Sequence, residues 1–599
     1  MNRFSRSPAR WTHAFCTAAS VVALSAVLLA APGDRAMAQA SDPGIAGAYL
    51  AAENAARRGD IAVAADFYAQ AVAADPENGA LLERAILHNI AAGRIETAVA
   101  LSRRLMEING DSQIALLQLA AEAFTRDDAA GILEMVEARG DATGPFVGHL
   151  IEAWASYAVD DTAGARTALE ALQNERTGGA AGEMLSTYHL GILDAALGDD
   201  AAAVEAFAIT TERAGAPTNR LTRVHAGALA RSGKVAEAIA LIDEQLARTR
   251  DGAQLRALRE DLEAGTIPGP VVTTGAEGAA EALFGISGFL TRGQNSIIGL
   301  AYARLGTYLN PDLTDAKLLM AQMLRRDEQY DLAIAAYESV PRNAPEAMQA
   351  QIGRAEAMQS AGQIEPAVIA MREVVARFPR SIDAHEALGN MLRREERFAD
   401  AAVAYDAAIK LLDPVEPLHW VYFYQRGISY ERSEQWELAE DDFLKALELE
   451  PDQPLVLNYL GYSWVELRRN MAEAEEMIEK AVEQRPEDGY IVDSLGWVQW
   501  RLGKFEEAVV NMERAVELRP VDPVINDHFG DALWMVGRRT EARFQWKRAL
   551  SFEPEEKDAE RIRAKLDRGL DEILEEEAAA GEPAIITLEE AEKKEADGG

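Results

Sequence analysis

The residue types that most often carry chemistry are scattered along this sequence. None of its eight histidines lies within a few residues of another: His13, His88, His149, His189, His225, His385, His419 and His528. A two-histidine zinc motif would need two of them one helical turn apart. The only cysteine is Cys16, so neither a disulfide nor a cysteine-rich zinc site can form within the chain. We therefore expect no metal centre and no thiol chemistry.

Acidic pairs are frequent, for example Asp441-Asp442 and Glu475-Glu476, and paired carboxylates serve general acid–base catalysis in many enzymes. Here they fall on the charged faces of predicted amphipathic helices, where solvated carboxylates are expected. The GxxxxGK[S/T] and GxGxxG phosphate loops and the GxSxG nucleophile turn are absent. We predict that the protein is not an enzyme and uses no cofactor.

Composition also limits the class of partner. The 599 residues include 98 acidic and 60 basic side chains, a net charge of −38, and 48% are hydrophobic. A chain this acidic repels nucleic acid and anionic lipid, so we expect protein or peptide partners and no nucleic acid. The apolar content is sufficient for a large core.

The N-terminus has the pattern of a secretory signal peptide. Three arginines precede the uncharged run Thr17–Ala31, and Ala36-Met37-Ala38 supplies a small-x-small cleavage site. The alternative, an uncleaved membrane anchor, usually needs about 20 apolar residues, and this run is shorter. Cys16 precedes the run, whereas a lipoprotein cysteine would follow it. We predict that residues 1–38 are removed and that the product is periplasmic without an integral span, either free in the periplasm or peripheral to the envelope.

The remaining sequence repeats itself every 34 or 35 residues. Glycines recur at positions 427, 461, 496 and 530, and prolines at 451, 486, 520 and 554. This period predicts pairs of antiparallel helices. Small residues at repeat positions 8 and 20 let the two helices approach, bulky residues near positions 11, 17 and 24 fill the gap to the neighbour, and proline at position 32 ends the second helix.

The repeat 420–453 shows the pattern most clearly. Positions 8, 11, 17, 20, 24, 27 and 32 are occupied by Gly427, Tyr430, Trp436, Ala439, Phe443, Ala446 and Pro451. This pattern resembles the tetratricopeptide repeat (TPR). The resemblance implies an all-α solenoid of helical hairpins whose concave face binds peptides or protein surfaces.

The pattern predicts two arrays. The expected organisation is a signal peptide at 1–38, a degenerate TPR-like array at 39–264, a Gly/Pro-rich break at 265–279, a TPR array of eight repeats at 280–556, a capping helix at 557–577 and an acidic disordered tail at 578–599. The apolar stripe between Ile562 and Leu574 supports the capping role, because a solenoid needs a last helix with a polar outer face.

Three runs, Leu460–Trp464, Asp493–Trp497 and Gly530–Trp534, resemble the C-terminal repeats of bacterial cell-envelope TPR adaptor proteins. One such group delivers substrates to a carboxyl-terminal processing protease. The resemblance implies a scaffold or adaptor that assists an envelope protease or assembly machine. The alternative is a structural component of an outer-membrane export apparatus.

In TPR proteins, positions 5, 9 and 12 of the first helix face the concave groove. In the last four repeats these positions hold Tyr424, Ile428, Glu431, Asn458, Tyr462, Val465, Asp493, Trp497, Trp500, Asp527, Asp531 and Trp534. We predict that the following residues, the predicted groove set, bind the partner: Tyr424, Asn458, Tyr462, Asp493, Trp497, Trp500, Asp527, Asp531 and Trp534. Aromatic anchors beside carboxylates favour a segment with apolar and basic residues. Alternatively, the three tryptophans only pack between adjacent first helices.

Overall fold

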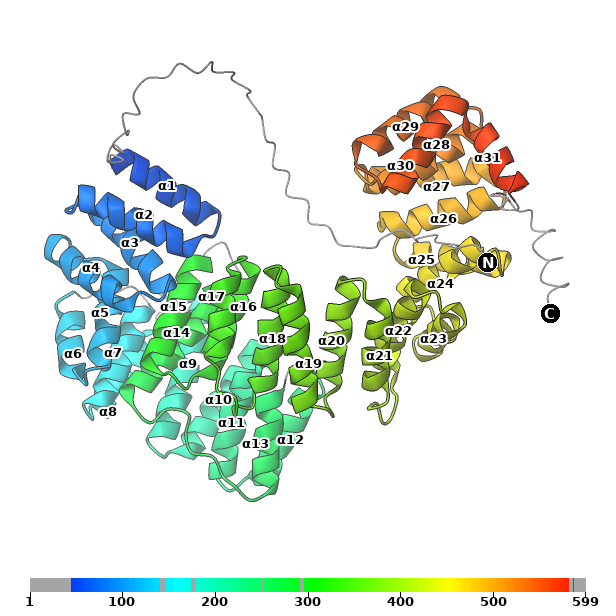
Figure 1. The fold of residues 1–599 in the computed structure, drawn as a ribbon. Coiled ribbons are helices and arrows are strands. Elements are labelled where there is room, and N and C mark those ends of the chain that lie inside the picture. The colour runs from blue at the N-terminus through cyan, green and yellow to red at the C-terminus, as the bar shows by residue number, and fades with distance from the viewer. Residues whose placement is uncertain are drawn as a thin grey trace, which may run out of the picture. The chain divides into compact units, whose positions relative to one another are not determined.

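The computed structural model describes residues 45–139, 146–173, 179–249, 252–290, 296–580 and 585. Within these ranges the chain forms 31 α-helices, one short 3-10 helix and no strand (Figure 1). The prediction of an all-α solenoid of helical hairpins is confirmed. The predicted signal peptide, residues 1–38, lies outside the described residues.

The chain divides into an N-terminal unit that ends at Arg377 and a C-terminal unit that begins at Phe378. The helices of the N-terminal unit are α1 (Ile45–Arg57), α2 (Ile61–Ala74), α3 (Gly79–Ala91), α4 (Ile95–Ile108), α5 (Gln113–Phe124), α6 (Ala129–Glu137), α7 (Val147–Ala158), α8 (Thr162–Ala171), α9 (Gly179–Ala196), α10 (Asp200–Ala214), α11 (Asn219–Arg231), α12 (Val235–Leu246), α13 (Ala253–Glu263), α14 (Gly275–Leu290), α15 (Ser296–Leu309), α16 (Thr314–Arg326), α17 (Tyr330–Glu338), α18 (Ala347–Ser360) and α19 (Ile364–Arg377).

The C-terminal unit continues the series of hairpins. Its elements are α20 (Ile382–Arg394), α21 (Phe398–Ile409), η2 (Pro417–His419), α22 (Trp420–Arg432), α23 (Trp436–Leu449), α24 (Pro454–Leu467), α25 (Met471–Gln484), α26 (Gly489–Arg501), α27 (Phe505–Leu518), α28 (Pro523–Met535), α29 (Arg539–Ser551), α30 (Glu556–Arg568) and α31 (Leu570–Ala579).

The repeated glycines explain how the two helices of a hairpin pack. A Cβ atom on Gly530 in α28 would lie 2.4 Å from the Trp546 ring in α29, and one on Gly427 in α22 would lie 2.7 Å from the Phe443 ring in α23. Real Cβ atoms do not approach this closely, so only glycine allows these contacts. The helix starts are also encoded locally, since the Asp522 carboxylate accepts hydrogen bonds from the first turn of α28.

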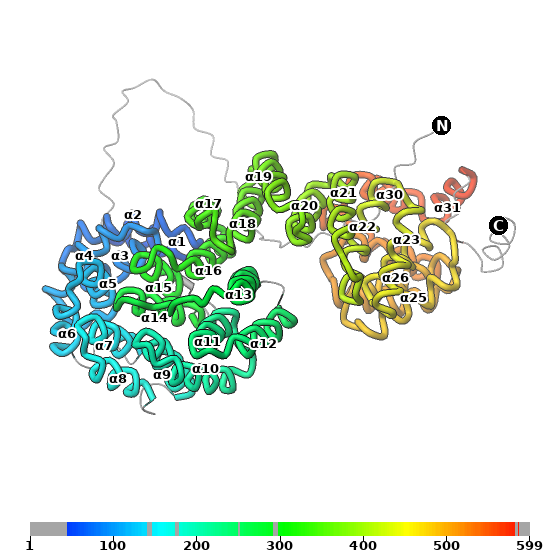
Figure 2. Tube along the Cα trace, turned by 90° about the horizontal axis from the view of Figure 1, so that it is seen from below, coloured from blue at the N-terminus to red at the C-terminus, as the bar shows by residue number. Residues whose placement is uncertain are grey.

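The prediction that 265–279 separates two arrays is wrong. Helix α14 begins inside this stretch and packs against α7, while α15 packs against α3 and α5. Figure 2 shows α14 and α15 enclosed by the curve of the helices that precede them. One apolar cluster runs from Ala48 to Ala316 and joins these elements. The inner face of the N-terminal unit is therefore occupied by the chain's own next hairpin.

The glycines of this stretch make a close helix–helix contact rather than a break. A Cβ on Gly278 would lie 2.1 Å from the Trp154 ring in α7, and one on Gly275 would lie 2.4 Å from the Trp154 carbonyl oxygen. The side chain of Trp154 is almost fully buried. The glycine content of this stretch predicts an interruption between helices. Instead, the lack of a side chain at Gly275 and Gly278 lets α14 pack directly against α7.

A buried ionic cluster fixes α14 in this position. The Arg220 guanidinium in α11 binds the Glu281 carboxylate in α14, and it also lies 2.8 Å from Asp315 in α16. The Tyr188 hydroxyl donates a 2.7 Å hydrogen bond to Glu281. Burial alone would raise the pKa of Glu281, but the charge of Arg220 together with the hydrogen bonds from Arg220 and Tyr188 outweighs burial and lowers that pKa. Removing one partner would leave a buried charge unpaired.

Residues 265–274, the strap, lead from α13 to α14 across neighbouring first helices. Arg231 in α11 donates to the carbonyl oxygen of Gly269 at 3.2 Å, and the Tyr157 hydroxyl in α7 donates to that of Thr273 at 3.5 Å. Val272 is buried. The prolines and glycines of the strap disfavour a helix, which suits an extended backbone that crosses these helices.

The predicted capping helix 557–577 is two helices. Gly569 has a φ of +91°, which ends α30 before α31 begins. A Cβ at this position would lie 2.9 Å from the Trp534 ring, so the residue must be glycine. Ile562, Leu570 and Ile573 are buried. Of the predicted disordered tail, Ala579 still belongs to α31 and Ile585 packs against the core of the C-terminal unit, while most of the other tail residues lie outside the described residues.

Candidate protein-binding site

The predicted groove set lies on the first helices of four successive hairpins, α22, α24, α26 and α28. Helices α24, α26 and α28 contact one another in this order, so their facing residues form one surface. The members of the set differ in burial and in the groups that they contact. The burial and the partners of each side chain show which of them can reach another protein.

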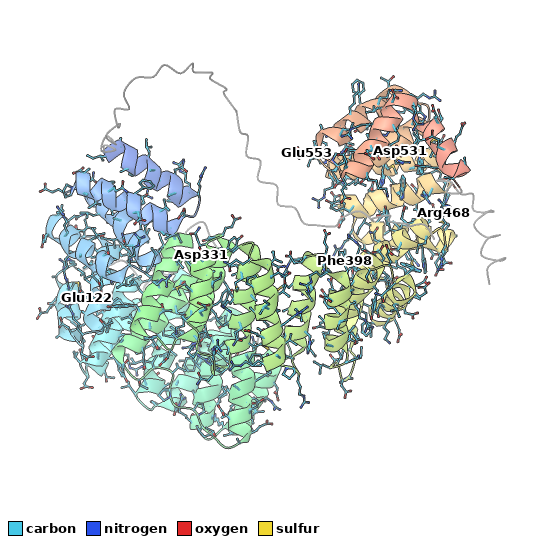
Figure 3. The ribbon with its side chains drawn as sticks, in the orientation of Figure 1. Glu122, Asp331, Phe398, Arg468, Asp531 and Glu553 are labelled. Atoms are coloured by element: carbon cyan, nitrogen blue, oxygen red, sulfur yellow. The ribbon has the colours of Figure 1, made fainter. Side chains whose placement is uncertain are left out.

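The residues on α28 are covered by α30. The Lys565 Nζ atom lies 2.6 Å from carboxylate oxygens of both Asp527 and Asp531, and Arg561 lies 3.2 Å from Asp531. Asp531, labelled in Figure 3, and Lys565 are both fully buried. Burial would raise the pKa of Asp531, but the charges and hydrogen bonds of Lys565 and Arg561 together outweigh it and lower that pKa. The two aspartates, predicted to bind a partner's basic groups, instead hold the chain's own α30.

The tryptophans form a packed stack. The Trp497 and Trp500 rings are parallel, with centroids 4.8 Å apart, and the opposite face of Trp497 stacks on His528 at 4.1 Å. Trp500 is fully buried, and Trp534 is buried against Trp546. Trp500 therefore lies in the packing between neighbouring first helices, as the alternative interpretation of the tryptophans has it, because these helices approach closely enough for the rings to fill the space between them.

Asp493 also belongs to this packed region. Its carboxylate lies 2.9 Å from Nδ1 of His528, and both side chains are buried. The Trp497 Nε1 atom donates a 2.8 Å hydrogen bond to Glu466 on α24. One carboxylate oxygen of Asp493 and the Trp497 Nε1 atom are thus engaged within the unit, whereas the other Asp493 oxygen and the Trp500 Nε1 atom are buried without a hydrogen bond to the described residues.

An aromatic surface remains on α22 and α24. Its residues, which we call the α22–α24 aromatic surface, are half-buried and lie against the apolar core: Trp420, Tyr424, Ile428, Tyr459 and Tyr462. Tyr424 packs edge-on against Tyr459 with centroids 6.0 Å apart, and its other neighbour Trp420 is 5.8 Å away. Sequence reasoning missed Trp420 and Tyr459, which occupy other positions of their helices; their aromatic character was the available signal.

Two polar groups accompany this surface. The Glu431 carboxylate accepts a 3.1 Å hydrogen bond from the Tyr459 hydroxyl, and burial raises the pKa of Glu431. Asn458 is buried, and its Oδ1 atom makes no hydrogen bond within the described residues. A buried acceptor without a partner is costly, so a ligand N–H that reached Asn458 would be favoured.

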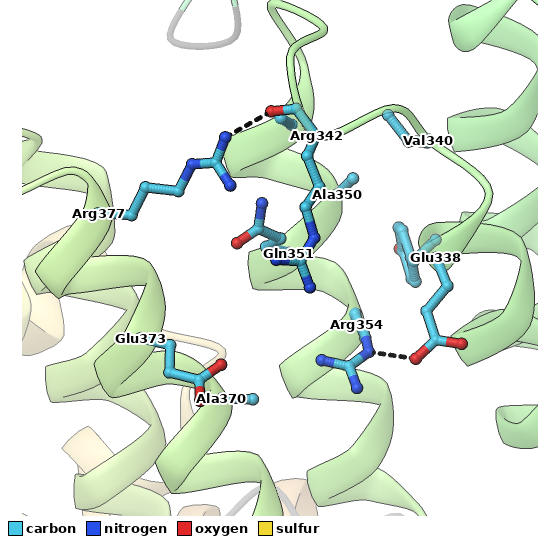
Figure 4. Close-up of a pocket in the computed structure, with 11 residues that line it drawn as sticks. Glu338, Val340, Arg342, Ala350, Gln351, Arg354, Ala370, Glu373 and Arg377 are labelled. Atoms are coloured by element: carbon cyan, nitrogen blue, oxygen red, sulfur yellow. Dashed lines mark hydrogen bonds and ion pairs between the residues drawn. The ribbon is translucent and has the colours of Figure 1, made fainter.

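The N-terminal unit contains a cavity of about 360 Å³ between α17, α18 and α19 (Figure 4). Arg342, Arg354 and Arg377 line it, facing Glu338 and Glu373. Arg354 pairs with Glu338 at 2.8 Å, and Arg377 donates to the carbonyl oxygen of Arg342 at 2.8 Å. Three arginines thus face two glutamates, and one of these ion pairs closes across the lining of the cavity.

Within the described ranges, no group of three or more histidine, cysteine, aspartate or glutamate side chains is arranged to hold a metal ion. None of the helices in the same ranges combines the length and the apolar composition that a membrane span requires.

Comparisons with known proteins support the repeat assignment. One tetratricopeptide-repeat model matches residues 358–415 and 424–489, and another matches 493–522. The TPR repeat-containing protein PA4667 of Pseudomonas aeruginosa is 35% identical over 85 residues, 14% of this chain and 14% of that protein. Tetratricopeptide repeat protein 13 of Homo sapiens is 28% identical over 179 residues, 29% of this chain and 20% of that protein. The matches thus span only a small part of these relatives.

The similarities to solved structures have low TM-scores and low sequence identities. The APC/C hetero-tetramer Cut9–Hcn1 has a TM-score of 0.37 at 15% identity, covering 87% of this chain and 96% of that chain. YrrB, described as a TPR protein with an unusual peptide-binding site, has a TM-score of 0.26 at 20% identity, covering 31% and 93%. The tetratricopeptide-repeat models match residues 358–415, 424–489 and 493–522, and the 34-residue period and the stacked hairpins agree with these matches.

Proposed function

We propose that the protein is a non-enzymatic scaffold or adaptor that binds a segment of another protein on the α22–α24 aromatic surface. The observation that carries this proposal is the contrast in burial along the first helices. Trp500 and Asp531 are sealed within the C-terminal unit, whereas Tyr424 and Tyr462 remain half-buried. Partly exposed aromatic side chains on a rigid helix are typical anchors of protein interfaces.

The chemistry of the surface suggests the ligand. Tyr424, Tyr459 and Tyr462 offer apolar rings, which favour apolar side chains on the partner. Glu431 favours a nearby lysine or arginine, and Asn458 Oδ1 can accept a backbone N–H. We infer an extended or helical segment with apolar and basic residues.

We also propose that the adaptor works in the periplasm, supported by the signal-peptide pattern of residues 1–38. Partners would then belong to the cell envelope, such as a protease or an assembly machine, as the resemblance to envelope adaptors implies. N-terminal sequencing of exported protein tests the location. A mature chain that begins after Ala38 is expected, and an intact Met1 would contradict the proposal.

The binding proposal is tested with Tyr424→Ala combined with Tyr462→Ala in the full chain. A partner recovered from envelope fractions should bind this variant at least about tenfold more weakly, because loss of hot-spot aromatics costs about 2 kcal/mol or more. Phe544→Ala is the matched control, since Phe544 is 65% exposed on α29 and lies outside the surface. Circular dichroism checks that both variants keep their helices.

If both variants bind the partner as tightly as the unmodified chain, the site lies elsewhere. Co-fractionation with an outer-membrane pore that is unaffected by loss of Tyr424 and Tyr462 would instead favour the alternative, a structural component of an export apparatus.

A further inference from the structure

A second cavity of the N-terminal unit lies against the strap. It has a volume of about 210 Å³, and its lining comes from α9, α10, α11, α13 and the strap. Ile192, Phe207, Val224 and Leu258 form its helical walls, and all four are buried. Val271 contributes the side of the strap. Most of the lining is therefore apolar, and we call this space the strap cavity.

The volume of the strap cavity suits an occupant of about the size of one ring. An apolar cavity of about 150 Å³ can bind benzene. Pockets for drug-sized ligands begin at about 300 Å³. The strap cavity, at about 210 Å³, lies between these two values. A peptide segment with its backbone and several side chains needs more room, so the fitting occupant is a small molecule.

Arg231 in α11 holds the strap against the cavity. Its Nη1 atom donates to the carbonyl oxygens of Pro268 at 3.4 Å and Gly269 at 3.2 Å, and its Nε atom lies 2.8 Å from the Asp200 carboxylate. Gly227, one turn earlier, keeps space between α11 and the strap, because a Cβ there would lie 3.3 Å from Arg231. Arg231 is thus engaged by the chain itself and serves as part of the wall.

Arg223 supplies an unused hydrogen-bond donor to the same lining. Its Nη2 atom lies 3.2 Å from the Asp315 carboxylate, whereas its Nε atom is buried and makes no hydrogen bond within the described residues. A buried N–H without an acceptor is costly, so a ligand acceptor that reached it would be favoured.

The charges around Arg223 favour an uncharged acceptor. The ionic cluster already balances two arginines against two carboxylates: Arg220 and Arg223 against Glu281 and Asp315. A ligand carboxylate would therefore enter an apolar cavity without a free opposing charge, which is costly. A carbonyl oxygen accepts the same hydrogen bond without that cost.

We propose that the strap cavity binds a small, uncharged apolar molecule, about one ring in size, whose carbonyl oxygen accepts a hydrogen bond from Nε of Arg223. The apolar walls supply most of the affinity and the single donor orients the ligand, as is usual in small-molecule sites. The proposal does not depend on the proposed function, because the strap cavity lies in the N-terminal unit and the α22–α24 aromatic surface lies in the C-terminal unit.

Three fluorinated probes with the same ring test the ligand class. The probe para-fluoroacetophenone has an uncharged carbonyl, para-fluorotoluene has no acceptor and para-fluorobenzoate has a charged carboxylate. Fluorine NMR titration of the full chain should show para-fluoroacetophenone binding about two- to tenfold more tightly than para-fluorotoluene, the gain expected from one hydrogen bond. It should also bind more tightly than para-fluorobenzoate. No saturable binding of para-fluoroacetophenone, or equal binding of the three probes, would overturn the proposal.

Methyl-labelled protein locates the bound probe without any substitution. Saturating para-fluoroacetophenone should shift the methyl signals of Ile192 and Val271, which line the strap cavity. The methyl signals of Val340, which lines the cavity between α17, α18 and α19, should stay unchanged. Unchanged signals at Ile192 and Val271 would place the probe elsewhere and overturn the assignment.

Filling the cavity should remove the site. Ala195 lines the strap cavity, so Ala195→Leu should weaken the binding of para-fluoroacetophenone at least about tenfold, because the added side chain occupies the space of the ring. Ala208→Leu is the matched control, since Ala208 is exposed on α10. Circular dichroism checks both folds, and the methyl shifts decide the same question if Ala195→Leu does not fold. Equal affinity of the two variants would overturn the proposal.

Arg223→Lys tests the donor separately from the walls. Lysine keeps a positive charge for Asp315 but lacks the Nε–H group of arginine. Binding of para-fluoroacetophenone should fall to the level of para-fluorotoluene, whose own affinity should not change. Arg259→Lys is the control, because Arg259 pairs with Asp243 on the outside of α13 and α12. A preference for the carbonyl probe that persists in Arg223→Lys would show that Nε is not the donor.

Discussion

Single residues decide which parts of the C-terminal unit are structural. Lys565 illustrates this, because it is fully buried and its ammonium group lies between two aspartates of α28. We expect Lys565→Met to lower the free energy of unfolding by about 3–5 kcal/mol, since Asp527 then loses its ion pair and Asp531 keeps only Arg561. Urea unfolding followed by tryptophan fluorescence measures this loss.

Lys445→Met is the control for Lys565→Met, because Lys445 forms an exposed pair with Glu448. This variant should cost less than about 1 kcal/mol. Equal losses in the two variants would show that Lys565 contributes no more than a surface charge.

His528 should make the C-terminal unit less stable as pH rises. Burial lowers the pKa of His528, but the charge and hydrogen bond of Asp493, together with the charges of Asp527 and Asp531, outweigh burial, so that pKa is raised above 6.5. The folded state therefore holds the proton more tightly than the unfolded state. This stabilisation is complete below about pH 6.5 and is lost as pH rises through the raised value. His528→Gln should remove the decline when unfolding, followed by tryptophan fluorescence, is measured from pH 6 to 9.

His189 should act in the opposite direction in the N-terminal unit. Burial lowers its pKa to about 4, so the folded state keeps the ring neutral. The contribution of neutral His189 to the free energy of unfolding is complete above about pH 6.5. It decreases as pH falls towards 4, because the unfolded state then binds a proton that the folded state does not. His189→Phe should slow amide exchange in α9 relative to the unmodified chain at pH 5, with a smaller effect at pH 7.5. The same ratio at both values would contradict the assignment.

Among the helices, α14 is the element whose placement most needs testing. A valine at Gly278 would overlap the Trp154 ring, and overpacking of this kind costs about 1–3 kcal/mol or more. We expect Gly278→Val to destabilise the N-terminal unit, measured by the thermal loss of circular dichroism. Gly285→Val in the same helix is the control, because nothing lies within 4 Å of that position. Similar stability of the two variants would mean that α14 does not pack closely against α7.

At the scale of the whole molecule, the division after Arg377 predicts two unfolding transitions. Seven tryptophans lie between residues 420 and 546, whereas Trp154 is the only one between residues 12 and 419. Fluorescence should therefore follow the C-terminal unit, and circular dichroism should follow both. Gly278→Val should lower the midpoint temperature of the N-terminal unit, which circular dichroism follows and fluorescence reports only weakly. The midpoint of the C-terminal unit should stay unchanged. A single transition, shifted equally in both probes, would contradict independent units.

The sequence alone determined the repeated local packing. Gly427, Gly461, Gly496 and Gly530 recur with the repeat period, and each lies against the second helix of its own hairpin. A contact between residues about 16 positions apart recurs in every repeat and so appears as a period. The hairpins, their small residues and the all-α class could therefore be predicted.

Only the tertiary structure decided what fills each inner face. The Tyr188–Glu281 hydrogen bond joins residues 93 positions apart, and Lys565 reaches Asp531 across 34 positions from outside the repeats. Such contacts occur once, so they leave no periodic signal. The same glycine that reads as a helix breaker at Gly278 is a packing residue once Trp154 lies opposite it. Repeat position therefore predicted which helix carries Trp500 and Asp531, and packing by later segments determined that they are buried.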